Sequence, residues 1–159
     1  KEILSLLESV IPRSAATAIQ EAIYKMDTRE LQKALENFLI QSISFHDASN
    51  EAFYHGLMLG LIALMDNQYK IRSNRESGDG RYDICMIPID TKHPGIIMEL
   101  KAKAGLSLNE LDALSSKALE QISIKRYNSE MQNDGITNIL SFGIAFSGKK
   151  MCIKTEQTE

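Results

Sequence analysis

The chain has 159 residues, of which 43% are hydrophobic and 25% charged, as in an ordinary globular protein with one substantial core. Its formal net charge is −3, which excludes a uniformly basic nucleic-acid-binding domain. No apolar run approaches the length of a membrane span, and no secretory signal opens the sequence. We therefore expect a cytoplasmic protein without a membrane partner.

Charge is unevenly distributed along the chain. Residues 1–66 hold five basic and nine acidic side chains, whereas residues 67–159 hold thirteen basic and twelve acidic ones. A nucleic-acid surface is therefore expected only locally, in the second part of the sequence. The absence of an initiator Met and the polar residues 155–159 lead us to expect a fragment of a longer protein.

The two cysteines, Cys85 and Cys152, have neither the spacing of a metal site nor that of a disulfide framework. Both lie in apolar segments. We expect them to be reduced core residues.

The first part of the chain is expected to be helical. Apolar residues recur at helical spacing on both sides of Pro12, and residues 27–30 have the form of a capping box that opens a third helix. These residues show no recognisable chemistry. We therefore divide the chain into an N-terminal helical segment, residues 1–48, and a second domain, residues 49–159.

A further helix is predicted from residue 50 to about residue 65, with an apolar stripe suited to packing on a sheet. Glu51 and His55 lie one turn apart on one face of this helix. Taken alone, they fit a surface glutamate and a partly buried histidine.

Three strands are predicted next, over residues 68–74, 81–88 and 95–101. Asp83 lies near the start of the second strand, and Glu99 and Lys101 share one face of the third. Neighbouring strands would bring the two carboxylates together, where they repel unless one is protonated or a cation lies between them. Mg²⁺ or Mn²⁺ satisfies that requirement with oxygen ligands and supplies a bound water as nucleophile.

The competing interpretation makes Asp83 a strand-end cap and makes Glu99 with Lys101 a charge pair that protects an edge strand. Edge protection fits poorly with the apolar residues around Glu99, which indicate an interior strand.

A capping box at residues 107–110 predicts a helix to about residue 129, with Gln121 and Lys125 one turn apart on a polar stripe. Two strands follow, over residues 136–146, with Gly143 inside, and residues 151–154. The order of elements is thus a helix, three strands, a helix and two strands. It predicts an α/β fold with a mixed central sheet, preceded by N-terminal helices.

Asp83 followed by Glu99-Leu100-Lys101 resembles the PD-(D/E)XK nuclease superfamily, although Tyr82 stands where the superfamily name has proline. The resemblance covers roughly residues 50–153 and implies a restriction-endonuclease-like core. Residues 73–76 and 80–83 look like one bacterial branch of that superfamily, commonly found C-terminal to an AAA-type ATPase-like domain. That likeness implies an ATPase-like domain in the same longer chain.

The resemblance also implies a metal-dependent nuclease, with DNA preferred over RNA as the substrate. Asp83, Glu99 and Glu51, with the carbonyl of Leu100, would bind Mg²⁺ or Mn²⁺, and Lys101 would position the attacking water or stabilise the transition state. The residues assigned to substrate binding are Arg81, Gln121, Lys125, Tyr127 and His55.

A noncatalytic module of the same fold is the alternative, serving as a partner-binding or regulatory domain beside an ATPase-like domain. The modest acidity and the lack of a clear basic stripe favour it, whereas the retention of Asp83, Glu99 and Lys101 together opposes it. A homodimer is left open.

Overall fold

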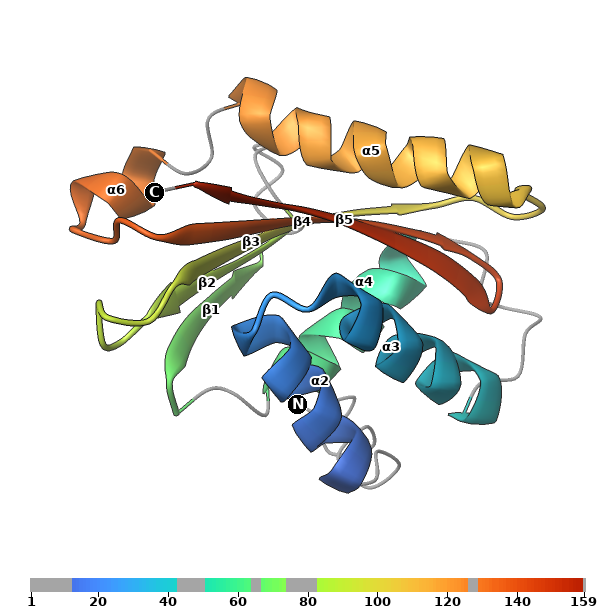
Figure 1. Ribbon diagram of the computed structural model, residues 1–159, viewed down its shortest axis with the longest axis horizontal. Helices are drawn as coiled ribbons and strands as arrows, with labels where there is room; N and C mark the ends of the chain where they lie inside the picture. Colours follow the sequence, from blue (N-terminus) through green and yellow to red (C-terminus); the bar gives the residue numbers. More distant parts are fainter. Residues whose placement is uncertain (1–12, 43–50, 64–66, 74–82, 126–128, 159) are drawn as a thin grey trace.

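A computed structural model describes residues 13–42, 51–63, 67–73, 83–125 and 129–158 (Figure 1). Within these residues a mixed sheet lies between two layers of helices. The helices are α2 (Arg13–Tyr24), α3 (Thr28–Ser42), α4 (Glu51–Ile62), α5 (Leu108–Lys125) and α6 (Ser129–Asn133). The strands are β1 (Tyr69–Ser73), β2 (Ile84–Pro88), β3 (Gly95–Ala102), β4 (Ile139–Ser147) and β5 (Lys150–Thr158).

The five strands lie side by side in chain order, β1-β2-β3-β4-β5. Every neighbouring pair is antiparallel except β3 and β4, which are parallel. A parallel pair requires a crossover connection, and α5 provides it. The expected α/β fold with a mixed sheet and preceding helices is therefore confirmed.

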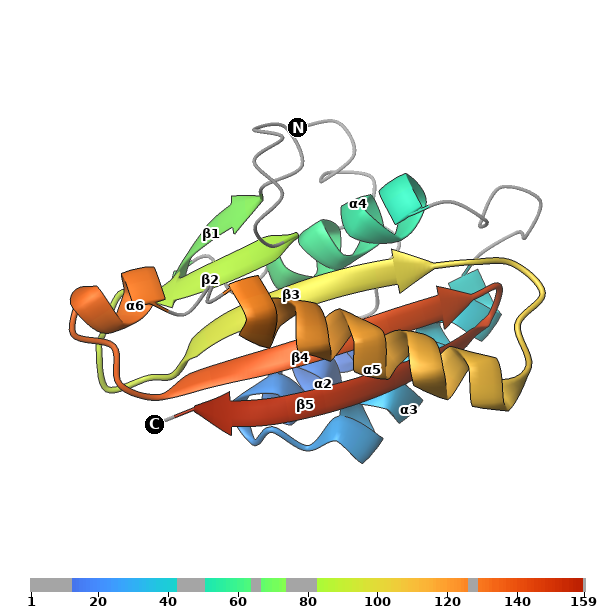
Figure 2. The same cartoon turned by 90° about the horizontal axis from the view of Figure 1, so that it is seen from above.

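The two faces of the sheet carry different helices: α2, α3 and α4 on one, and α5 and α6 on the other (Figures 1 and 2). Ile96, Met98 and Leu100 of β3 join the large cluster formed by α2, α3 and α4. Ile97 joins a smaller cluster with Ile122 of α5. Because side chains alternate along a strand, Glu99 and Lys101 lie on the α5 face.

One of the two predicted capping boxes is complete. The amide of Glu110 donates to Ser107 Oγ at 3.2 Å, and the amide of Ser107 donates to Glu110 Oε1 at 3.0 Å, so these two amides at the start of α5 are satisfied. At the start of α3 only half of the box forms: the amide of Glu30 donates to Asp27 Oδ1 at 3.1 Å, but the amide of Asp27 donates to the carbonyl of Ala22. These caps fix where the two helices begin.

Gly143 allows α5 to lie directly against the middle of β4. A Cβ atom at this position would be 2.5 Å from the amide nitrogen of Leu119 and 2.5 Å from the carbonyl oxygen of Ser115. Gly143 is the register partner of Glu99 on β3. The close helix contact is therefore made one strand away from Glu99.

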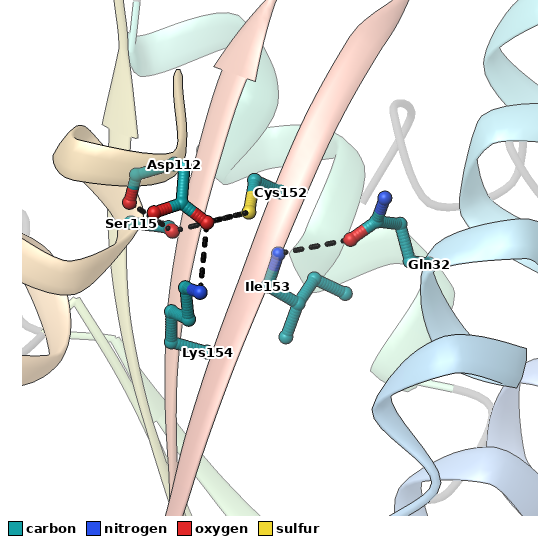
Figure 3. Close-up of polar contacts among 6 residues, drawn as sticks. All are labelled: Gln32, Asp112, Ser115, Cys152, Ile153 and Lys154. Atoms are coloured by element: carbon teal, nitrogen blue, oxygen red, sulfur yellow. Dashed lines mark hydrogen bonds and ion pairs between the residues drawn. The ribbon is translucent and has the colours of Figure 1, made fainter. Parts of the chain in front are cut away.

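Helices on both faces hold the edge strand β5, as Figure 3 shows. Lys154 Nζ lies 2.7 Å from Asp112 Oδ1 of α5. On the opposite side, the amide of Ile153 donates to Gln32 Oε1 of α3 at 3.1 Å. Gln32 thus covers one of the edge donors that an exposed strand would otherwise offer to another chain.

Both cysteines are free thiols, as expected. Cys85 is buried, and the half-buried Cys152 accepts a hydrogen bond from Ser115 Oγ at 3.3 Å.

Several element boundaries differ from those expected. β4 begins at Ile139 rather than at residue 136, because Ile136 is buried in the smaller cluster beneath α6 and its amide donates to the carbonyl of Met131. β5 continues to Thr158 instead of ending at residue 154, because its polar half pairs with β4 as an edge strand. α5 ends at Lys125, and the short helix α6, which was not expected, begins at Ser129.

The boundary between the two expected domains, residues 48 and 49, lies outside the described residues and stays a prediction. Side chains of α2 and α3 share the large hydrophobic cluster with α4 and the sheet. Among the described helices, none is both long and apolar enough to cross a bilayer.

Candidate active site

Asp83 lies at the start of β2 and is joined to β3 by two hydrogen bonds. Its amide donates to the carbonyl of Met98 at 3.2 Å, and its Oδ2 accepts from the amide of Leu100 at 2.7 Å. The two contacts flank Glu99 along β3. Sequence reasoning placed Asp83 beside Glu99 through adjacent strands, and these hydrogen bonds bring the two residues together.

The carbonyl of Leu100 points toward the same side of β3 as its amide, because the N–H and C=O of one strand residue face the same neighbour. The amide is bonded to Asp83. The carbonyl oxygen is therefore aimed at the side of β3 where the carboxylate of Asp83 lies. This direction suits Leu100 as a backbone oxygen ligand next to Asp83.

Glu99 is a buried acid, with 6% of its surface exposed. Lys101 Nζ lies 4.0 Å from Glu99 Oε2 on the same face of β3. A buried carboxylate is costly unless a positive group accompanies it, and Lys101 is placed to supply part of that charge. One quarter of the Lys101 side chain remains exposed.

α4 begins at the end of the sheet where β3 ends (Figures 1 and 2). Two contacts fix it there: Tyr54 donates from its hydroxyl to the carbonyl of Gly148 at 2.8 Å, and His55 Nε2 lies 2.7 Å from Ser73 Oγ. Glu51, the first residue of α4, is half-buried and one turn from His55. Glu99 and Lys101, however, lie on the other face of the sheet from α4, and within the described residues Glu51 does not form a group of three acids with Asp83 and Glu99.

His55 is 2% exposed and bonded to a strand hydroxyl, so its ring helps to hold α4 on β1. Sequence reasoning considered it for substrate binding and did not single out Ser73. The contact joins residues 18 positions apart on a helix and a strand, and local periodicity carries no signal for it.

α5 directs one flank toward β3 and the other toward β5. Asp112 marks the β5 flank through its contact with Lys154. Gln121 lies nine residues further on, which at 3.6 residues per turn is half a turn around the helix, so it lies toward β3. Gln121 is half-buried. Lys125 is the last residue of α5, and its side chain lies outside the described structure.

Arg81 and Tyr127, also expected in the site, lie outside the described residues. Within the described part of the chain, no group of three or more His, Cys, Asp or Glu side chains is close enough to hold a metal ion. Mg²⁺, however, is commonly bound by one or two carboxylates and completes its shell with water and phosphate oxygens. The donors at this place are hard oxygens from Asp83, Glu99 and the Leu100 carbonyl, and they fit such an ion.

The fold and these residues together define a class: an α/β domain of the restriction-endonuclease type, with an acid at the start of one strand and Glu-x-Lys on the next. The family model described as the PD-(D/E)XK nuclease superfamily matches residues 49–156 of the chain. The chain therefore belongs to the PD-(D/E)XK nuclease superfamily. No match is found among curated proteins.

Proposed function

We propose that the protein is a metal-dependent nuclease that hydrolyses phosphodiester bonds, with DNA as its preferred substrate. Membership of a nuclease superfamily supports the reaction class. The observation that carries the proposal is the hydrogen bond between Asp83 and the amide of Leu100, because it joins the separate acid to the Glu-x-Lys strand.

The carboxylates of Asp83 and Glu99, with the carbonyl of Leu100 and with Glu51 at the start of α4, would hold Mg²⁺ or Mn²⁺. Such an ion, when bound, lowers the pKa of a coordinated water and offsets charge on the phosphate. Glu99 is directed to the site by the rigid interior of the sheet. Asp83 is held in place by its bond to Leu100.

Lys101 is the residue that we assign to the attacking water. Its ammonium lies 4.0 Å from Glu99 Oε2 and its side chain is partly exposed, so it can donate a hydrogen bond to that water and counter negative charge that develops on the phosphate. The protonated ammonium of Lys101 only donates hydrogen bonds, so the oxygen of the water must face it.

The remaining assignments are also proposals. Substrate contacts are assigned to Arg81, Gln121, Lys125 and Tyr127, whereas the expected role of His55 in substrate binding is not proposed again, because its buried ring is bonded to Ser73. We further propose a cytoplasmic protein whose longer chain carries an ATPase-like domain. Homodimer formation is kept as a weaker proposal, without a contact among the described residues that supports it.

The experiment is cleavage of labelled single-stranded, double-stranded and branched DNA and RNA, with Mg²⁺ or Mn²⁺ compared with EDTA. The variants are Lys101→Ala and, as a matched control, Lys92→Ala. Lys92 is an exposed lysine in the connection between β2 and β3, before β3 begins. We expect metal-dependent cleavage that Lys101→Ala abolishes and Lys92→Ala leaves unchanged.

Absence of cleavage for every substrate, in protein shown to be folded, would contradict a nuclease active in this chain. It would favour the noncatalytic partner-binding module instead. Cleavage that survives Lys101→Ala would leave a nuclease but would overturn the role assigned to Lys101.

A further inference from the structure

The edge strand β1 carries two basic residues on one of its faces. Tyr69 is buried and Ile71 half-buried against the large cluster of α2, α3 and α4. Lys70 and Arg72 alternate with them and are both exposed. They therefore lie on the opposite face of the sheet, which is the face of α5.

The strand register confirms this placement. Arg72 pairs with Cys85 of β2, which in turn pairs with Ile97 of β3. Directly opposed residues of antiparallel strands share a face, and Cys85 and Ile97 both belong to the cluster under α5 and α6. Arg72 is thus on the face that carries Glu99 and Lys101, and Asp83 is two residues from its partner Cys85.

The described helices leave this part of the sheet face uncovered. Figure 2 looks onto this face and shows α5 over β4, between β3 and β5, and α6 beside the end of β2, with β1 at the far edge of the sheet. Within the described part of the chain, neither Lys70 nor Arg72 takes part in an ion pair or a side-chain hydrogen bond. Their charges are therefore available to a negatively charged ligand on the same face as the candidate site.

We infer that Lys70 and Arg72 bind the sugar–phosphate backbone of one substrate strand, which follows β1 from Lys70 to Arg72 and then passes over Asp83 and Glu99. The inference rests on the proposed nuclease function and adds the path of the substrate. Residues two apart on a strand are separated by about 6.6 Å, close to the spacing of consecutive phosphates in one nucleic-acid strand. The sheet therefore supplies two phosphate contacts before the site is reached.

Phosphate contacts have a signature that a structural role lacks. Each contact to a single strand contributes about 0.7 to the slope of log affinity against log salt concentration, because bound counterions are released. Losing Lys70 and Arg72 should therefore reduce the slope by roughly 1.4. A charge whose only task is to keep an edge strand from aggregating would leave that slope unchanged.

The test measures binding of labelled single-stranded DNA over a salt series, with duplex DNA and single-stranded RNA as parallel arms. It compares two double variants. The β1 variant carries both Lys70→Gln and Arg72→Gln, and the α3 control carries both Arg29→Gln and Lys33→Gln. Arg29 and Lys33 are exposed residues of α3, on the opposite face, so the control makes the same change in net charge. All proteins carry Lys101→Ala to prevent cleavage, and gel filtration checks that each stays monodisperse.

We expect the β1 variant to bind at least about tenfold more weakly, with a reduced salt slope, and the α3 control to match its parent. A double variant with Lys70→Arg and Arg72→Lys keeps both charges and should bind like the parent. Equal affinity and slope for the β1 variant and the α3 control would overturn the inference. Cleavage is measured separately, in protein that keeps Lys101. If the protein cleaves DNA but the β1 variant binds normally, the inferred substrate path is refuted and the proposed nuclease function stands. If the β1 variant binds more weakly but no protein cleaves, the proposed nuclease function is refuted and the binding surface stands.

Discussion

The carboxylate of Asp83 accepts a hydrogen bond from the amide of Leu100, the residue between Glu99 and Lys101. This contact gives Asp83 the capping position that was the competing interpretation of its sequence. A cap and a metal ligand need not exclude each other, because a carboxylate has two oxygens and about four lone-pair positions. The same bond that ends the β2–β3 ladder also orients the acid toward the Glu-x-Lys strand.

The two roles of Asp83 can be separated by substitution. Asp83→Asn keeps an oxygen that can accept from the amide of Leu100, whereas Asp83→Ala leaves that buried strand donor without its acceptor, at a cost of about 1–3 kcal/mol. We expect urea unfolding to show a clear loss of stability for Asp83→Ala and a smaller one for Asp83→Asn. Both variants should lose metal-dependent cleavage. Equal stability of Asp83→Ala and the wild type would show that the cap contributes nothing.

Gly143 should be intolerant of any side chain. Gly143→Ala places a methyl group against backbone atoms of Ser115 and Leu119, so α5 must move away from β4 at a cost of about 1–3 kcal/mol. The matched control is Gly56→Ala in α4, where a Cβ would meet nothing within 4 Å. Alanine favours a helix, so the control should be neutral or more stable by up to about 1 kcal/mol.

Thermal unfolding of the two alanine variants checks this contrast. Because Gly143 is the register partner of Glu99, displacement of α5 should also reduce cleavage by Gly143→Ala. Similar melting temperatures for the two variants would show that α5 does not rest on Gly143 as described.

The Asp112–Lys154 pair should make a pH-dependent contribution to stability. Its hydrogen bond and charge lower the pKa of Asp112 and raise the pKa of Lys154. A lowered carboxyl pKa stabilises the fold above the unfolded value of about 3.9, and a raised lysine pKa stabilises it below about 10.4. The contribution is therefore present at neutral pH and disappears as pH falls through the folded pKa of Asp112 or rises through that of Lys154.

Urea unfolding of Asp112→Asn from neutral to acid pH measures this effect, with Glu120→Gln as the control on the same helix. The difference from wild type should be small because both groups are exposed, should shrink in high salt, and should vanish at acid pH. A difference that grows as the pH falls would contradict the assigned sign.

Much of the fold was predictable because its signals are local. The helix caps at Asp27 and Ser107 act within one turn, and the alternation around Glu99 is carried by consecutive residues. The start of β4 was not predictable in the same way. Ile136 has the apolar character of a strand residue, but its burial beneath α6 is a tertiary contact that the sequence does not display.

The residues of the candidate site also fall into those that a local motif predicts and those whose positions depend on tertiary packing. Asp83, Glu99 and Lys101 follow from a motif, and the structure joins them by the bonds described. The positions of Lys70 and Arg72 depend on which face of the sheet α5 covers, and that is a property of the assembled sheet. The pairing of His55 with Ser73 likewise depends on how α4 docks against β1.

The most direct test of the central claim is a calorimetric titration with Mn²⁺ of the wild type, Asp83→Asn, Glu99→Gln and the control Glu120→Gln. The account predicts binding by the wild type and the control, and at least a tenfold loss of affinity, about 1.4 kcal/mol, in the two site variants. Bound metal should also raise the melting temperature of the wild type but not of the site variants. Equal Mn²⁺ affinity in all four proteins would show that Asp83 and Glu99 are not metal ligands.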